Sequence, residues 1–363
     1  MQETFIRFNK QDNPDFFKTL NQRVNQYFSQ RGITRYGNTQ MVIKSIFMFA
    51  IYFTPFVLMV TGVVSGTLPI LAMWFTMGLG VAGIGLSVMH DANHGTYSKS
   101  PTINKFMSIS LTYLGGYHMN WRIQHNVLHH TFTNIDGYDE DIEKKGIIRF
   151  SPNQEKRSIF KFQVLYAPIL YSILTLYWVT YKDFDQLRSY HKRDLLKSQK
   201  LTLNKALFRI ILIKVMYYAI IIGLPLLFGT PWWLVLTGFL IMHAVGGLIL
   251  ALVFQSAHVL ESTEFVSPEE GASVETSWAI HQMKTTSNFA VGNAPLTWFL
   301  GGLNHQVEHH LFPNICHVHY PAISKIVKKT AKEFDVPYLQ HKTFVGAISN
   351  HFKFLHYLGK KAA

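Results

Sequence analysis

The segment MFAIYFTPFVLMVTGVVSG, from Met48 to Gly66, contains no charged residue. A run of this length can cross the hydrocarbon core of a bilayer as an α-helix. Within the bilayer no water is available to the backbone, so a helix that satisfies its own amide groups is the favoured conformation. The segment therefore predicts a membrane-spanning helix, and 48% hydrophobic residues along the chain allow for more of them.

Three further runs are also long and predominantly apolar, and the four together predict two helical hairpins. Each pair is joined by a short uncharged turn, SGTLP in the first hairpin and GTPWW in the second. The predicted fold is an all-α integral membrane protein with four transmembrane helices in two hairpins, interfacial helices and a His-rich cytoplasmic helical cap. The expected spans are residues 41–64, 68–89, 207–228 and 231–254. They lie in a membrane domain of residues 41–325, between a cytoplasmic N-terminal segment (1–40) and a cytoplasmic C-terminal helical tail (326–363).

The formal net charge is +13, and the basic residues flank the apolar runs. Residues 1–40 carry six Lys and Arg against three acids, and residues 181–205 carry seven against three. By the positive-inside rule, both termini and the central loop are expected on the cytoplasmic side of a bacterial inner membrane or an ER-like membrane. We find no nucleic-acid-binding motif and no cleavable signal peptide, so the predicted partner of this charge is a lipid bilayer.

A fifth apolar stretch, residues 162–181, is ambiguous by hydropathy. If it crossed the membrane, the basic loop after it would be external and the histidines would be divided between the two sides. We therefore interpret it as an interfacial or re-entrant helix, which suits its Tyr, Trp and Pro168 content. The single Cys316 excludes an internal disulfide and a thiolate-ligated iron–sulfur cluster.

Histidines gather in four segments on the predicted cytoplasmic side: HDANHG (90–95), WRIQHNVLHH (121–130), FQSAHVLE (254–261) and NHQVEHH (304–310). Neutral imidazole is a good ligand for iron, copper, zinc and nickel. Eight histidines exceed the coordination of one ion, so we expect two metals side by side. The predicted ligands are His90, His94, His125, His129, His130, His258, His309 and His310.

Helical spacing gives a more detailed expectation. His90 and His94 share one helix face, as do His125 and His129, while His130 points about 100° further round. One turn before His309, either His305 or Gln306 faces the metals, directly or through water, and the sequence leaves both open. Four acids are expected to orient the imidazole rings: Asp91, Asp139, Asp141 and Glu308.

The remaining histidines are given other roles. His118 is expected to be a hydrogen-bonded interfacial residue, and His243 to bond a neighbouring helix or contact substrate, since it lies about 22 Å of helix before His258. His281, His317 and His319 are expected to be structural or to support the ligands. Four others read as surface residues: His191, His341, His351 and His356. The glycines of GLGVAGIGL (78–86) predict close helix packing.

With the segments HDANH, HNVLHH and HQVEHHLFP and two transmembrane hairpins, the chain resembles the membrane fatty acid desaturase family over residues 40–325. Its third segment is similar to the front-end branch (Δ5, Δ6 and sphingolipid types), with Q-x-x-H-H on Gln306, His309 and His310. The resemblance implies two iron ions, O2 as co-substrate, and a cis double bond introduced into an acyl-CoA or acyl-lipid chain. Zinc can take the place of iron in overexpressed protein.

Two consequences follow from this resemblance. No histidine precedes His90, so a fused cytochrome b5 domain is not expected, and electrons must come from a separate ferredoxin or cytochrome b5. The alternative on the same di-iron scaffold is a lipid hydroxylase, an epoxygenase or another oxygenase. A non-catalytic metal transporter is disfavoured, because His243 is the one clear polar candidate at mid-membrane.

Overall fold

The computed structural model describes residues 6–143, 146–267 and 273–360. The chain divides into two compact units. Unit 1 comprises Met1–Gly37, Gln124–Ala167 and Val253–Ala363, and unit 2 comprises Asn38–Ile123 and Pro168–Leu252. Both consist mainly of helices with almost no sheet, in agreement with the predicted all-α class.

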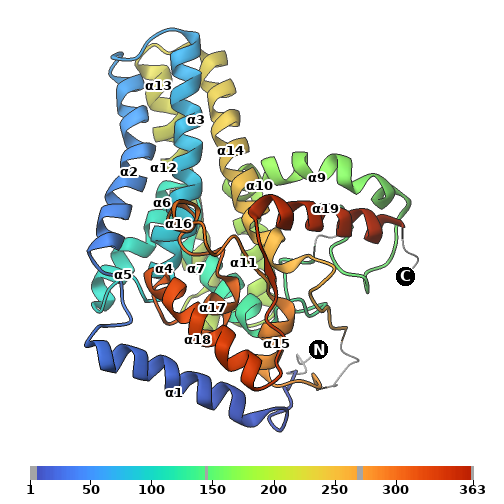
Figure 1. The fold of residues 1–363 in the computed structure, drawn as a ribbon. Coiled ribbons are helices and arrows are strands. Elements are labelled where there is room, and N and C mark those ends of the chain that lie inside the picture. The colour runs from blue at the N-terminus through green and yellow to red at the C-terminus, as the bar shows by residue number, and fades with distance from the viewer. Residues whose placement is uncertain (1–5, 144–145, 268–272, 361–363) are drawn as a thin grey trace. The chain divides into compact units, whose positions relative to one another are not determined.

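Unit 2 contains the apolar helices (Figure 1). Four stretches are long and apolar enough to cross a membrane, and they coincide with the four expected spans: Thr39–Val60, Thr67–Asn93, Leu203–Leu227 and Trp232–His258. Their elements are α2 (Thr39–Val60), α3 (Thr67–Gly83), η1 (Ile84–Val88), α4 (Met89–Asn93), α12 (Leu203–Tyr218), η6 (Ala219–Gly223), α13 (Leu224–Leu227) and α14 (Trp232–His258), whose last turns enter unit 1.

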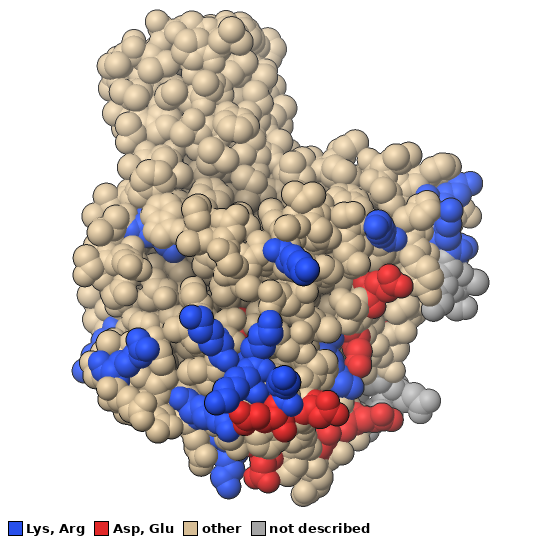
Figure 2. Space-filling view, viewed as in Figure 1, with Lys and Arg blue, Asp and Glu red and all other residues tan. Residues whose placement is uncertain are grey.

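Local sequence explains how α2 begins and what it faces. The Asn38 side chain caps the helix by accepting hydrogen bonds from the amides of Gln40 and Met41. On its outer surface apolar residues such as Ile46 and Val57 are exposed, which fits contact with lipid rather than water. The visible face of this helical bundle shows no Lys, Arg, Asp or Glu over most of its length (Figure 2).

Glycines let the spans approach closely, as the sequence predicted. A Cβ atom on Gly80 would lie 2.8 Å from the Cβ of Tyr52 on α2, and one on Gly78 would lie 2.7 Å from the Cβ of Val245 on α14. Such contacts are shorter than van der Waals packing allows, so a larger residue would push these helices apart. Small residues at helix interfaces are typical of membrane bundles.

Buried polar side chains cross-link the apolar helices of unit 2. His243 on α14 contacts the Tyr217 hydroxyl at 2.9 Å and the Thr175 hydroxyl at 3.0 Å, which confirms the expected bond to a neighbouring helix. Lys214 on α12 donates to Asp183 and to the carbonyl of Gly115 (2.7 Å). These contacts satisfy polar groups that would be costly to leave alone in an apolar environment.

The ambiguous stretch is a bent helix pair. Ser158–Ser172 and Leu174–Lys192 meet at 57°, and together they pass the test for a broken fifth span or a re-entrant loop. The pair consists of η3 (Ser158–Phe162), α9 (Gln163–Ser172), α10 (Leu174–Tyr177), η4 (Trp178–Lys182) and α11 (Asp183–Lys192). Its interfacial placement stays a prediction. Four more short helices belong mainly to unit 2: α5 (Pro101–Ser108), α6 (Ser110–Tyr113), α7 (His118–Arg122) and η5 (Leu195–Gln199).

Unit 1 carries most of the His-rich segments on short helices. In chain order its remaining elements are α1 (Pro14–Arg31), η2 (Ile123–His129), α8 (His130–Phe132), α15 (Trp278–Thr285), β1 (Asn288–Phe289), α16 (Ala294–Phe299), α17 (Gln306–Leu311), η7 (His317–His319), α18 (Tyr320–Glu333), β2 (Gln340–His341) and α19 (Phe344–Lys360). Strands β1 and β2 pair in parallel, with Asn288 opposite Gln340.

The apolar core of unit 1 supports the helix that carries the last histidines. Val307 and Leu311 of α17 pack into a cluster with residues of α1, α15 and α18, including Leu20, Met283 and Val327. Because this face of α17 is buried against apolar side chains, the six-residue helix is held firmly despite its length.

Candidate metal centre

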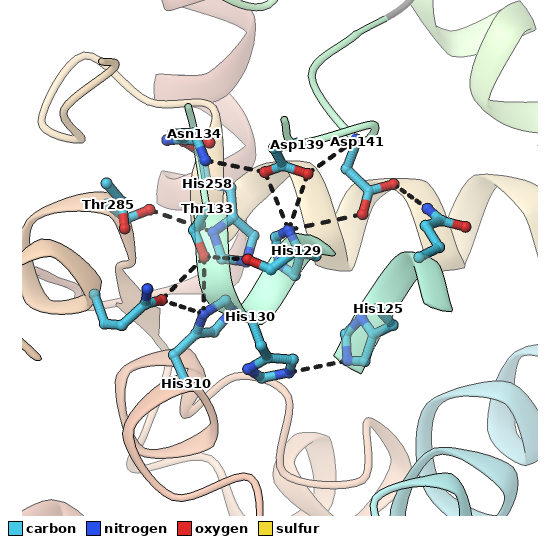
Figure 3. A network of polar contacts seen from close by, with 12 residues as sticks. His125, His129, His130, Thr133, Asn134, Asp139, Asp141, His258, Thr285 and His310 are labelled. Carbon is cyan, nitrogen blue, oxygen red and sulfur yellow. Dashed lines mark hydrogen bonds and ion pairs between the residues drawn. The ribbon is translucent and has the colours of Figure 1, made fainter. Parts of the chain in front are cut away.

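Six of the predicted ligands converge within unit 1. Helix η2 and α8 provide three of them, the end of α14 provides one, and α17 provides two; they are His125, His129, His130, His258, His309 and His310. Most of these side chains are buried, although they come from segments far apart in sequence. Figure 3 shows five of the rings, with the acidic side chains beside His129.

The first cluster consists of His125, His130 and His309. Their Nε2 atoms form a triangle, 3.2 Å from His125 to His130, 3.0 Å from His130 to His309 and 3.4 Å from His309 to His125. A neutral imidazole nitrogen either donates or accepts, so in a ring of three at least one pair must be two donors or two acceptors. One shared cation removes this conflict. Ligand atoms bound at 2.0–2.1 Å to one ion lie roughly 3 Å apart, as these do.

The second cluster consists of His129, His258 and His310, whose ligand atoms lie within 4.8 Å of one another. The Nε2 atom of His258 is buried and has no hydrogen-bond partner in the part of the chain that the structure describes. A lone pair left without a partner is costly unless an ion occupies it. His310 also groups with His130 and His309, so the two clusters are adjacent.

The helix that carries the second segment is not α-helical throughout. His125 and His129 do stack, at 5.5 Å between ring centroids, but they belong to different clusters. Residues Ile123–His129 form a π-helix, in which i→i+5 hydrogen bonds make residues five apart close neighbours. His125 therefore meets His130 instead of diverging from it.

Acceptors at Nδ1 fix the rings of the second cluster. His129 Nδ1 lies 3.1 Å from Asp139, His310 Nδ1 lies 2.8 Å from the side-chain oxygen of Gln282, and His258 Nδ1 lies 3.3 Å from the carbonyl of Thr285. When Nδ1 carries the proton, Nε2 carries the lone pair, which is the tautomer that binds a metal through Nε2.

Asp139 is itself held in place. The backbone amides of Asn134 and Asp141 donate to its two oxygens at 2.9 and 3.0 Å, and it is fully buried. Asp141 lies 3.7 Å from His129 and accepts a hydrogen bond from Gln124. Both acids therefore lie where the sequence expected them to orient a ring.

Three supporting residues were missed by the sequence reasoning. Gln282 and Thr133 contact each other and His310, and the Tyr320 hydroxyl lies 3.2 Å from Nδ1 of His309. Thr133 follows His130 by three positions, so proximity to the His segment was an available signal. Gln282 and Tyr320 lie in segments without a recognisable motif.

The side chains of His305 and Gln306 have different neighbours. Nδ1 of His305 lies 3.6 Å from Glu308, whereas the side chain of Gln306 lies beside the His258 imidazole. Glu308 accepts hydrogen bonds from Asn288 (2.8 Å) and Tyr338 (2.9 Å). Burial raises the pKa of Tyr338, so its hydroxyl keeps the proton that it donates. Glu308 thus links α17 to β1 and lies beside the His305 ring.

His90, His94 and Asp91 belong to unit 2. The rings of His90 and His94 lie 4.8 Å apart at an edge-to-face angle, and both contact Trp121. Nδ1 of His90 lies 3.6 Å from Asp91. The two histidines therefore share one side of their helix, as the spacing predicted.

Two other histidines are structural. His281 contacts the carbonyl of Thr133 at 2.7 Å, and burial lowers its pKa to about 4. His351 was interpreted as a surface residue, which is wrong: it is fully buried, and its Nδ1 lies 2.8 Å from the carbonyl of Val259. The packing of α19 onto unit 1 buries it, and a lone histidine in an amphipathic helix gives no sign of which way it faces.

The chain is similar to known proteins over most of its length. A family model described as fatty acid desaturase matches residues 65–342. The chain is 38% identical to the sn-1 linoleoyl-lipid 6-desaturase of Synechocystis over 95% of this chain and 96% of the relative. It is 33% identical to the enzyme of the same name from Arthrospira platensis, over 94% and 91%. It is 36% identical to an acyl-lipid (8-3)-desaturase of Physcomitrium patens, over 96% of this chain and 72% of the relative.

Proposed function

Because the chain belongs to the fatty acid desaturase family, we propose that it desaturates linoleoyl chains of membrane lipids at the 6 position. It is a fatty acyl desaturase with a lipid substrate, and the two cyanobacterial relatives, matched over nearly their whole length, share that printed activity. The balanced reaction is –CH2–CH2– + O2 + 2 e− + 2 H+ → –CH=CH– + 2 H2O.

The metal is proposed to be a pair of iron ions. His125, His130 and His309 would hold one ion, and His129, His258 and His310 would face the other; the Nε2 triangle of the first cluster is the observation that carries this assignment. His90 and His94 stay predicted ligands on their spacing. Iron supplies, from O2, an oxidant strong enough for an unactivated C–H bond.

The protein's own groups prepare this site. Asp139, Gln282 and the Thr285 carbonyl hold three imidazoles in the metal-binding tautomer, so little reorganisation is needed. Gln306 is the better candidate of the open pair to face the metals, since its side chain lies beside His258. Burial of these rings excludes water, which protects a reactive site from side reactions.

The proposed site faces the cytoplasm. The four apolar helices anchor the chain in the membrane. The basic segments 1–40 and 181–205 support a cytoplasmic position for both chain termini and for the central loop. Electrons would come from a separate ferredoxin or cytochrome b5.

Expression in a host that lacks 6-desaturated lipids tests the proposal. Cells fed linoleate should accumulate a triene with a new double bond at position 6, located by mass spectrometry after derivatisation. A pulse of labelled linoleate should appear as triene in glycerolipid before the CoA pool if the substrate is a lipid. The His309→Ala variant is the inactive control. Hydroxylated lipid without new unsaturation would overturn the proposal, and triene in the CoA pool first would overturn its substrate.

A further inference from the structure

A basic groove lies between α1 and α18 of unit 1. It has a volume of ≈ 520 Å³, and its lining includes Arg23, Arg31, Lys325 and Lys329. Arg23 is compensated by Glu333 at 2.6 Å. Arg31, Lys325 and Lys329 are exposed, so the groove presents a net positive charge to solvent. Figure 2 shows Lys and Arg gathered over the part of the molecule where Figure 1 draws α18.

One wall of the groove is a helix that also reaches the first histidine cluster. Helix α18, one of its walls, begins at Tyr320, whose hydroxyl lies 3.2 Å from Nδ1 of His309. Lys325 follows Tyr320 by five residues, roughly 8 Å along the helix axis. Val327, from the opposite face of α18, packs in the core that supports α17. A partner seated in the groove would therefore contact α18, the helix whose first residue touches a proposed metal ligand.

We propose that this groove is the docking site for an acidic one-electron carrier protein. The inference rests on the proposed function, whose reaction takes up two electrons per turnover. Charge complementarity favours the fit, because opposite charge on two surfaces steers encounter and fixes orientation. The groove is also lined by polar groups suited to the rim of a transient interface, those of Gln26, Gln30 and Thr330.

A membrane surface is the less suitable occupant. Helices that lie on a bilayer bury large apolar side chains in it. Neither α1 nor α18, both wholly within the described residues, carries an exposed large hydrophobic side chain. In the same unit, Leu165 of α9 and Val345 of α19 are largely exposed, so lipid-compatible surface lies elsewhere.

Binding to a plant-type [2Fe–2S] ferredoxin tests the proposal without relying on turnover. Metal-loaded protein in neutral-lipid nanodiscs would be titrated with oxidised ferredoxin by calorimetry. The double variant Lys325→Glu/Lys329→Glu should weaken the dissociation constant about tenfold or more. The control Lys342→Glu/Lys353→Glu changes net charge equally at exposed sites outside the groove and should change it less than about twofold. Carbodiimide cross-links from ferredoxin carboxylates should map to Lys325 or Lys329.

Steady-state turnover with reduced ferredoxin provides the second test of the docking site. In the groove variant the KM for reduced ferredoxin should rise about tenfold, while the rate with dithionite and methyl viologen stays normal, which also shows that the variant is folded. Equal binding losses in both double variants, or none in either, would overturn the proposal. Unchanged ferredoxin affinity with loss of co-purified anionic lipid, seen by native mass spectrometry, would assign the groove to lipid instead. If the unmodified protein bound ferredoxin but formed no triene, the proposed function would fail and the docking site would stand.

Discussion

The Nε2 atoms of His130 and His309 lie 3.0 Å apart, although 179 residues separate the two histidines along the chain. This contact joins α8 to α17, and His125 completes the triangle from η2. Because like-charged or like-polarised nitrogens repel at this distance, the arrangement is most stable with a cation between them.

Replacing His309 by Ala should abolish desaturation and lower the metal content of the purified protein. The change removes one of three nitrogens that converge on the same point. Metal per polypeptide, measured by inductively coupled plasma mass spectrometry, and triene formation are the readouts. His356→Ala, at an exposed position, should leave both unchanged. Full turnover in the His309 variant would remove this residue from the centre.

Asp139→Asn should weaken metal affinity about 10- to 100-fold without preventing folding. The carboxylate accepts from the Asn134 amide, the Asp141 amide and His129 together, and an amide has one oxygen too few for this. Competition with a chelator measures the affinity. The exposed Asp194→Asn is the matched control. Equal chelator resistance in the two variants would show that Asp139 does not tune the ligand.

The variants Gln306→Ala and His305→Ala should affect different properties of the protein. The Gln306 side chain lies beside His258, so its loss should reduce the rate or alter the metal's absorption spectrum. His305 lies beside Glu308, which is bonded to Asn288 and Tyr338, so its loss should lower the melting temperature instead. Spectra and thermal unfolding of both variants decide the question. The reverse pattern would assign the metal-facing position to His305.

The free energy of unfolding should decrease as the pH is lowered, because of His351. Burial lowers the pKa of His351 from 6.5 to about 4, so the folded state keeps it neutral while the unfolded chain takes up a proton. The stabilisation is complete above pH 6.5 and is lost as pH falls toward 4, by up to about 3 kcal/mol.

His351→Gln should flatten this dependence in thermal unfolding between pH 4.5 and 7.5. The glutamine amide can still donate to the Val259 carbonyl, but it does not titrate. His191→Gln, at an exposed site, is the control and should follow the unmodified protein. An unchanged pH slope in the His351 variant would contradict the assignment.

Sequence patterns predicted the elements whose signal is local and strong. The spans were found because a predominantly apolar run of about twenty residues has few other uses in a protein. The histidine segments were found because imidazoles at helical spacing are rare by chance, and six of them do meet in unit 1. The acids Asp139 and Asp141 were found because they follow the second segment closely.

Other features depend on tertiary contacts that leave no local trace. Tyr320 and Gln282 reach the ligands from segments with no motif of their own. The burial of His351 is decided by which face of α19 packs on unit 1. Whether His305 or Gln306 points to the cluster depends on where α17 begins, since one residue of shift rotates the helix by about 100°.

The π-helix at Ile123–His129 has a consequence for how this segment can evolve. Its wider turn accommodates one residue more than an α-helix would, and that surplus aligns His125 with His130. Side chains between the histidines can therefore drift as long as they fill the same space. The length of the segment cannot change in the same way. Loss or gain of a single residue here would rotate one histidine out of its cluster, while the other histidines of that cluster stayed in place.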